Sequence, residues 1–404
     1  MTMSTLDDAA LDELRSVGDP EAYAVVAEYF GTPGAAAGDL FAALIRHPGD
    51  PGAGRPGPVT DYYAERPPWP SWACVDLVRQ GQRYFERWGP QILSSLLLAS
   101  LPDAYAAAKG VQVLRLTARL ATDTQRRLIE TTQMVVDTMT VGGLDVGATG
   151  YLTIRRVRLM HAAVRYLIAH DPFVKHTCDE TTPSRWCEQW GLPINQEDLL
   201  GTLLTFTVVT FEALERSGVP VTRADADAYL HTWNVVAHLL GIRPDLLPLD
   251  YDTAVALRRD IRRRQYAPST AGHEMTAALM SLAAAQTRPR LLAGMPRSTT
   301  RYLIGDDVCD LLGVPPADWT RVLFAPARRV LTALSLDQRH DWLMRVVTAR
   351  LNRWMIDEFL RRERGGERPR FTLPRHLADA WSMPGAAEAP AGTEAPAGTG
   401  GTRW

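Results

Sequence analysis

Apolar residues recur at helical spacings through most of the chain between residues 72 and 364. This pattern predicts helices over residues 74–87, 90–101, 105–120, 123–140, 150–170, 196–217, 223–240, 250–264, 270–285, 297–312, 316–334 and 336–363. Asp123, Asn195 and Thr222 stand at the start of three of these segments, where such residues cap helices. Alternating strand-like runs joined by tight turns are absent from the sequence. We therefore expect an all-α fold with a single large helical domain.

The segments outside this domain differ from it in composition. Residues 1–71 contain a helical pattern and then a stretch rich in proline and glycine, whose aromatic residues predict that it packs on the core. Residues 72–364 form the predicted helical domain, and residues 365–382 a C-terminal extension. Residues 383–404 are mostly Ala, Pro, Gly and Thr and include two copies of Glu-Ala-Pro-Ala-Gly-Thr. Such a composition cannot bury a core, so this tail is expected to be disordered.

Composition and charge narrow the possible functions. The 404 residues are 46% hydrophobic, as in an ordinary globular protein, and a net charge of −2 gives no reason to bind nucleic acid or an anionic membrane. Long uncharged stretches such as residues 199–211 are shorter than the roughly 20 apolar residues of a membrane span. The first 15 residues lack the pattern of a secretory signal. We expect a cytoplasmic protein without membrane insertion, and the oligomeric state is left open.

Familiar catalytic and metal-binding motifs are absent. No glycine-rich loop follows a predicted strand, and P-loop, GxSxG and HExxH motifs do not occur. None of the four cysteines belongs to a CxxC pair. His176, Cys178 and Cys187 come nearest to a metal cluster, but their spacing matches no standard zinc site. Polar residues of a surface loop are the simpler interpretation.

The segment from Tyr151 to His170 holds the most informative candidate, His161. It shares one helical stripe with four apolar residues, Ile154, Val157, Val164 and Ile168. Arg158 and Arg165 lie three residues before it and four after it, within one turn of the same face. An unpaired arginine is costly to bury, so a dianionic ligand against this helix would explain the arrangement. Haem offers an axial site for imidazole and propionates that bind arginine. The alternative is a core histidine with arginines that extend to solvent.

A second segment, residues 123–139, has a polar face beside its apolar stripe. Arg127, Glu130, Thr131 and Met134 follow the spacing i, i+3, i+4, i+7 of one helix face. A guanidinium and a hydroxyl one turn apart could hold a small polar ligand, such as O₂, over a metal. The alternative is an amphipathic helix whose polar edge is solvated.

Five stretches, in this order along the chain, resemble a known family. They are GPQILSSLLLASLPDAYAAAKG (89–110), RRLIETTQ (126–133), RLMHAAVR (158–165), NQEDLLGTLLTF (195–206) and YLHTWNVVAHLLGI (229–242). Together they resemble the latex-clearing protein (rubber oxygenase) family and its MpaB-type oxygenase relatives, over roughly residues 72–310.

The resemblance implies a haem b protein with a globin-like helical core. By this analogy His161 is the proximal iron ligand, and Arg158 and Arg165 are partners of the propionates or of the proximal side. Arg127 and Thr131 correspond to the pair of the distal pocket.

Two departures from the family change the expected chemistry. Glu130 stands where the family has a distal lysine, and residues 109–112 lack the glutamate that has been proposed as a base in the family. We also expect no secretion signal of the kind that the family carries. A small lipophilic substrate, such as an alkene, an isoprenoid or an aromatic compound, is therefore expected in place of rubber.

The sequence thus favours a haem-dependent oxygenase that uses O₂ and has Glu130 as its candidate base. His231 and His238 are the next candidates for that role, although packing in the core is the simpler interpretation of both. The helices around them offer four apolar pocket candidates, Phe206, Phe211, Trp233 and Leu240. The arginine-rich run 258–264 is expected to be a solvated face. A non-catalytic haem protein, acting as a sensor or carrier, is the main alternative, and a helical scaffold without a cofactor is the third.

Overall fold

The computed structural model describes residues 6–33, 35, 39–40, 44, 57–117, 122–170, 186–330 and 332. The expected helix at 336–363, the C-terminal extension and the expected tail all lie outside these residues. In the described part every regular element is a helix, apart from one isolated bridge between Ala107 and Tyr266. The predicted all-α fold is therefore confirmed.

The described chain forms the following elements. The α-helices are α1 (Asp8–Leu14), α2 (Pro20–Gly31), α4 (Gly57–Ala64), α5 (Val75–Ser95), α6 (Leu101–Tyr105), α7 (Val111–Thr117), α8 (Thr122–Met139), α9 (Thr149–His170), α10 (Gln196–Leu204), α11 (Thr210–Ser217), α12 (Arg223–Leu239), α13 (Tyr251–Gln265), α14 (Thr270–Gln286), α15 (Met295–Ile304) and α16 (Asp306–Leu311). The other helical elements are the π-helical segments η1 (Leu96–Ser100) and η3 (Thr205–Val209) and the 3₁₀ turns η2 (Glu188–Trp190), η4 (Pro244–Leu246), η5 (Arg290–Leu292) and η6 (Trp319–Leu323).

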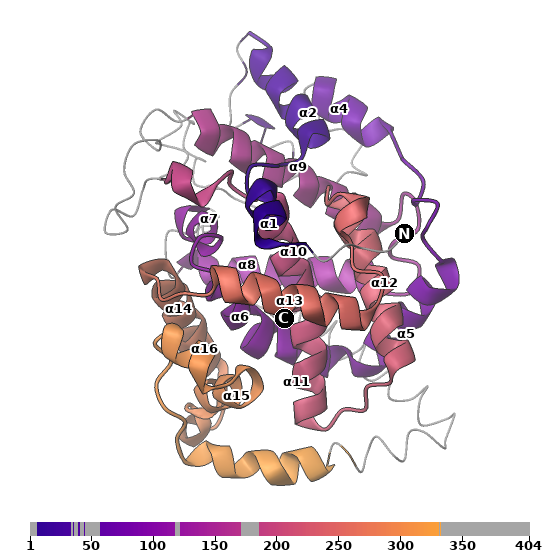
Figure 1. The fold of residues 1–404 in the computed structure, drawn as a ribbon. Helices are drawn as coiled ribbons and strands as arrows, with labels where there is room; N and C mark the ends of the chain where they lie inside the picture. The colour runs from indigo at the N-terminus through magenta and orange to yellow at the C-terminus, as the bar shows by residue number, and fades with distance from the viewer. Residues whose placement is uncertain are drawn as a thin grey trace, which may run out of the picture.

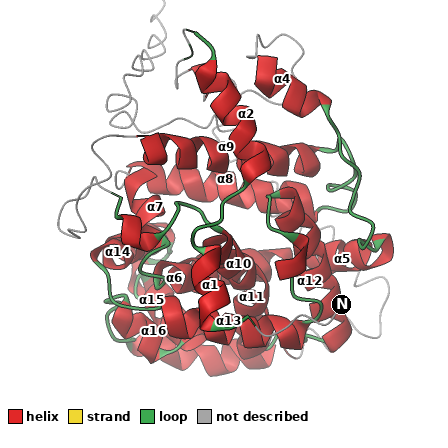
Figure 2. Ribbon diagram, turned by 45° about the horizontal axis from the view of Figure 1, so that its top comes forward, coloured by secondary structure: helices red, strands yellow, loops and turns green. Residues whose placement is uncertain are grey.

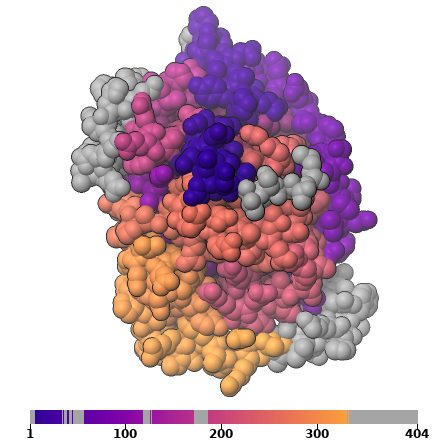
Figure 3. Space-filling model, viewed as in Figure 1, coloured from indigo at the N-terminus to yellow at the C-terminus, as the bar shows by residue number. Residues whose placement is uncertain are grey.

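Two helix pairs organise the molecule. Helix α12 packs along α5 (Figure 1), and α8 packs along α9. Figure 2 shows α8 and α9 side by side, with α2 and α4 on the outer side of α9. In the space-filling view, the indigo N-terminal part runs from the middle of the visible face to its top, and the orange last described helices lie at the bottom (Figure 3). The α8–α9 pair is therefore held between the N-terminal helices and the rest of the bundle.

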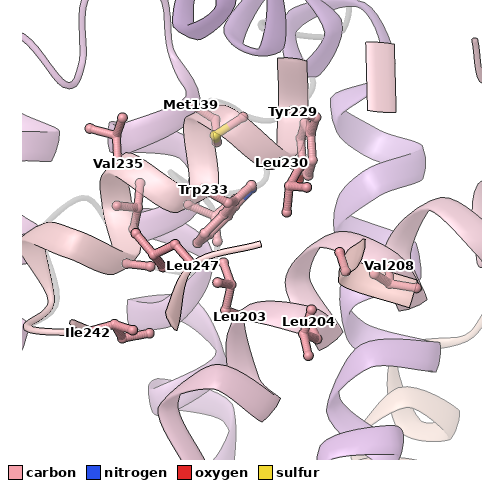
Figure 4. Packing of buried hydrophobic residues seen from close by; sticks show 14 of the residues in the cluster. Met139, Leu203, Leu204, Val208, Tyr229, Leu230, Trp233, Val235, Ile242 and Leu247 are labelled. Carbon is pink, nitrogen blue, oxygen red and sulfur yellow. The ribbon is translucent and has the colours of Figure 1, made fainter. Parts of the chain in front are cut away.

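The largest hydrophobic core lies where α5, α8, α10 and α12 converge. Met139, Leu203 and Trp233 come from three different helices and are at most 4% exposed (Figure 4). Burying a side chain of this size stabilises the fold by about 1.5–3 kcal/mol. A second cluster joins α2 and α4 to α9 through residues such as Val26, Tyr62 and Leu159.

Two predicted helices contain a π-helical segment that the pattern did not reveal. The expected helix 196–217 is interrupted by η3, and η1 follows α5 in the same way. The two segments pack on each other. Ser100 Oγ donates a hydrogen bond to the carbonyl of Thr205 at 2.7 Å, and Thr210 Oγ1 donates to the same carbonyl at 3.2 Å. These bonds satisfy a carbonyl in a distorted turn, and such turns are frequent at functional sites.

Other boundaries differ for local reasons. The predicted break near residues 88–89 appears as a kink at Trp88, two residues before Pro90, inside the continuous helix α5. Part of the proline-rich stretch is helical, because α4 buries Tyr62 and Tyr63. Asn195 and Thr222 cap their helices as expected, each accepting a bond from a backbone N–H three residues on. Asp123 instead lies inside α8.

Candidate functional site

A cavity of about 430 Å³ lies between the α8–α9 pair and the helices α6, α7, α10, α12 and α13. Its volume falls in the usual range for ligand sites, roughly 300–1,000 Å³. Much of the wall is apolar and includes Phe206, Trp233 and Leu240, as predicted. Phe211, the fourth predicted pocket residue, instead stacks on Tyr84 in the core at 5.2 Å between ring centroids.

Helix α9 lines the cavity with one continuous face. The lining residues are Thr153, Arg156, Val157, Met160, His161 and Val164. Their spacings of three, one, three, one and three residues are those of a single stripe on an α-helix. His161 is therefore placed at a cavity by the periodicity of its own helix.

The imidazole of His161 is buried and uncharged. Burial, and secondarily the Arg165 guanidinium, lowers its pKa to about 4, although Asp19 acts in the opposite direction. The ring is therefore neutral at physiological pH, as a ligand to a metal must be. Its Nδ1 atom is buried without a hydrogen-bond partner.

Helix α8 faces the same cavity with its polar edge. Arg127, Glu130, Thr131 and Met134 all line it, so the stripe expected from the sequence is real. Arg127 Nη1 donates to Thr117 Oγ1 at 3.2 Å and to the carbonyl of Leu114 at 3.4 Å. These bonds to α7 hold the guanidinium at one edge of the cavity.

A close helix contact sets the distance between the two faces. A Cβ atom at Gly150, at the start of α9, would lie 2.4 Å from the carbonyl oxygen of Asp137 on α8 and 2.6 Å from that of Gly143. Only glycine fits there, because real Cβ atoms do not approach backbone atoms that closely. The glycine lets α8 and α9 approach each other with their lining faces directed at one cavity.

The structure corrects the placement of Arg158 and Arg165, which do not line the cavity. Arg158 binds Asp19 through two bonds, of 2.6 Å from Nε and 2.8 Å from Nη2. Arg165 donates to the carbonyls of Pro193 at 3.0 Å and Ile194 at 2.6 Å. At about 100° per residue, both arginines lie beyond His161, on the side away from the middle of the lining stripe. Nearness to His161 along the helix did not mean nearness to the cavity.

Sequence reasoning missed Arg156, the α9 arginine that does line the cavity. Its Nε atom is buried without a hydrogen-bond partner. It lies beside Val157 and Met160, which also line the cavity, but outside the stripe predicted from the sequence, which ran from Ile154 to Ile168 without Met160.

A second residue that sequence reasoning missed is Asp198 of α10. Its carboxylate lies next to residues 109–112, the stretch that lacks the family's glutamate. A Cβ atom at Gly110 would lie 3.1 Å from Asp198 Oδ1, and Asp198 lines the cavity. Its Oδ1 accepts a bond from Arg15 at 3.0 Å and its Oδ2 one from Asn195 at 2.8 Å. Burial raises the pKa of Asp198 although Arg15 acts against this shift. Asp198 is therefore a candidate proton acceptor.

The arginine-rich run is not simply a solvated face. Arg258 lines the cavity and binds the fully buried Asp103 at 3.0 Å, and Tyr266 donates to the other oxygen of the same carboxylate. Arg264 pairs with Glu197 at 3.2 Å. The expected solvent exposure is thus wrong for both arginines, because α13 places them against buried acids.

His231 and His238 lie away from the cavity lining. Both pack edge-on against Trp72, with ring centroids 5.8 and 5.9 Å apart, respectively. His231 Nε2 accepts a hydrogen bond from the backbone N–H of Cys74 at 2.8 Å. These contacts agree with the simpler prediction for both histidines, which was packing. Neither side chain is placed to act as a base in the cavity.

No cluster of three His, Cys, Asp or Glu residues that could hold a metal ion occurs among the described residues. His176 and Cys178 lie outside that part of the chain. Cys187 is disulfide-bonded and is not available as a thiolate ligand. No helix in the described ranges is both long and apolar enough to cross a membrane.

Comparison with known proteins identifies the family. Residues 82–336 match the family model described as ER-bound oxygenase mpaB/B'/rubber oxygenase, catalytic domain. The chain is 26% identical over 319 residues to the rubber oxygenase of Streptomyces sp. (strain K30), a match that covers 76% of this chain and 72% of that protein. Its fold is similar to that of latex clearing protein LCP in the closed state, with a TM-score of 0.61, 22% identity and coverage of 87% and 90% of the two chains. The chain therefore belongs to the mpaB/rubber oxygenase catalytic-domain family.

Proposed function

We propose that the protein is a haem b-dependent oxygenase that uses O₂ to oxidise a small lipophilic substrate. The observation that carries this proposal is the convergence of His161 from α9 and the Arg127–Glu130–Thr131 face from α8 on one largely apolar cavity. Membership of an oxygenase family supports it.

The residues at the cavity fit the cofactor chemically. His161 offers a neutral imidazole, which could bind the iron of a haem. Arg156 offers a guanidinium at the same wall, and guanidinium groups bind carboxylates such as haem propionates. When bound, haem supplies the redox-active iron at which O₂ is activated.

The polar residues of α8 have separable roles in this proposal. Arg127, oriented by its bonds to Thr117 and Leu114, donates hydrogen bonds toward the cavity and stabilises negative charge there. Thr131 adds a hydroxyl one turn away on the same face. Glu130 and Asp198 both line the cavity and are the candidates to replace the missing loop glutamate as a base. Burial raises the pKa of Asp198, which makes it a better proton acceptor than an exposed carboxylate.

The proposed substrate class follows from the rest of the wall. Phe206, Trp233 and Leu240 offer apolar and aromatic surface but few directional contacts. An alkene, an isoprenoid or an aromatic compound is held by such a wall through burial alone.

The test is O₂ consumption by the haem-loaded protein with a panel of short isoprenoids and aromatic compounds, together with identification of the products by mass spectrometry. The proposal predicts substrate-dependent uptake of O₂ and incorporation of label from ¹⁸O₂. Reversible O₂ or CO binding without product, over the whole panel, would instead identify a sensor or carrier.

A further inference from the structure

Helix α9 carries four arginines, and three of them are engaged away from the cavity. Arg155 donates to the carbonyl of Tyr62 and lies with its guanidinium 4.1 Å from the centre of that ring. Arg158 is paired with Asp19, and Arg165 binds two backbone carbonyls. None of the three lines the cavity.

Arg156 differs from the other three α9 arginines in its position and in its lack of a bound partner within the described part of the chain. It lines the cavity, and no hydrogen bond or ion pair is recorded for it among the described residues. Its Nε atom is buried without a partner. A partly buried guanidinium without a counter-charge destabilises a protein, so its presence in the wall calls for an anionic ligand.

The position of Arg156 relative to His161 suggests what that ligand is. The two residues lie at opposite edges of the lining stripe, with Val157 and Met160 between them. Five residues of helix separate them by about 7.5 Å along the axis. A flat ligand that reaches His161 with its centre and lies over the apolar middle of the stripe would present its edge to Arg156.

We propose that Arg156 binds a carboxylate of the cofactor and so positions it over His161. This inference rests on the proposed haem dependence. The contact is a charge-assisted hydrogen bond between guanidinium and carboxylate, which adds both affinity and orientation. Arg156 is thus a positioning residue, and its expected effect is on cofactor affinity.

The test compares haem with haem dimethyl ester, whose carboxylates are masked, in titrations of the full-length haem-free protein. We expect the wild type to bind haem roughly tenfold to a hundredfold more tightly than the ester, as one charged hydrogen bond would give. Arg156→Gln should lose this preference by weakening haem binding while leaving ester binding unchanged. Arg156→Lys should restore part of it, because lysine keeps the charge without the planar fork.

Arg263→Gln is the matched control. Arg263 also lies on a helix, α13, but it is exposed, pairs with Asp8 at 2.7 Å and does not line the cavity. This variant removes the same charge outside the cavity and should bind haem and ester like the wild type. The inference is overturned if Arg156→Gln weakens haem and ester equally, or if Arg263→Gln reproduces its effect. Circular dichroism of each haem-free variant checks that the fold is intact.

A substrate carboxylate is the competing source of the same chemistry. A long-chain fatty acid titrated into the haem-loaded wild type and into haem-loaded Arg156→Gln separates the two. Equal binding to both supports the inference, whereas loss of fatty-acid binding in the variant overturns it in favour of a substrate contact. If the wild type binds haem and its dimethyl ester equally tightly, the role of Arg156 is refuted but the proposed haem dependence is not. If the wild type binds neither haem nor the ester, the proposed function is refuted as well.

Discussion

Replacing Gly150 by alanine perturbs the contact that aligns the two lining faces. The new Cβ atom would lie 2.4 Å from Asp137 O and 2.6 Å from Gly143 O, whereas ordinary contacts begin at 3.4 Å. Both obstacles are backbone atoms and cannot rotate away, so α8 and α9 must separate by about 1 Å. Overpacking of this kind costs about 1–3 kcal/mol, and the better helix propensity of alanine returns at most about 1 kcal/mol. The expected net loss is roughly 1–2 kcal/mol of unfolding free energy.

Urea unfolding followed by circular dichroism measures this loss, and Gly201→Ala is the matched control. Gly201 also lies within a helix, but its added Cβ would meet only Ile261 Cγ2 at an ordinary 3.6 Å. That variant should be as stable as the wild type or slightly more so. If Gly150→Ala and Gly201→Ala unfold at the same urea concentration, the close contact does not constrain the α8–α9 pair and the reasoning is refuted.

Three further predictions concern the cavity. Arg127→Ala should reduce turnover on the order of a hundredfold at unchanged haem occupancy. Thr131→Ala should reduce it less, because water can replace a hydroxyl. Steady-state kinetics and the haem content of each variant check both expectations, and loss of haem would contradict the assignment. If Asp198 accepts the proton, Asp198→Asn should remove activity while Glu130→Gln retains most of it, and the reverse order in the same assay would transfer the role to Glu130. In the haem-free protein the pKa of His161 is lowered to about 4, so the unfolded chain binds the proton more readily than the folded protein does. The free energy of unfolding should therefore fall by up to roughly 3 kcal/mol as the pH drops from about 6.5 to about 4. The midpoint of urea unfolding should depend less on pH in His161→Leu than in the wild type, and an equal dependence would show that His161 is not its source.

Local patterns predicted the helices and much of the cavity lining. The stripe of Arg127, Glu130, Thr131 and Met134 could be read from its spacing because all four belong to one helix. The period of α9 likewise placed His161 on a lining face. Such features depend on the geometry of a single element, which the sequence encodes directly.

Features that depend on two elements were not predictable in this way. The bonds of Arg158 to Asp19 and of Arg165 to two carbonyls require the positions of distant segments. The same is true of Asp198, which reaches Gly110 from another helix, and of Arg258, whose acid partner lies on α6. Proximity in sequence to His161 pointed to Arg158 and Arg165, but the groups that bind these two side chains away from the cavity belong to other segments of the chain.

The most direct test of the account is the haem content of the purified protein and of His161→Ala. We expect about one haem b per chain in the wild type, with a Soret band that changes on reduction, and loss of most haem in the variant while its helical circular-dichroism signal persists. Arg158→Gln, whose side chain is paired with Asp19 away from the cavity, should retain the cofactor wherever it remains folded. A colourless wild type, or a His161→Ala variant with full haem occupancy and an unchanged spectrum, would contradict the central claim.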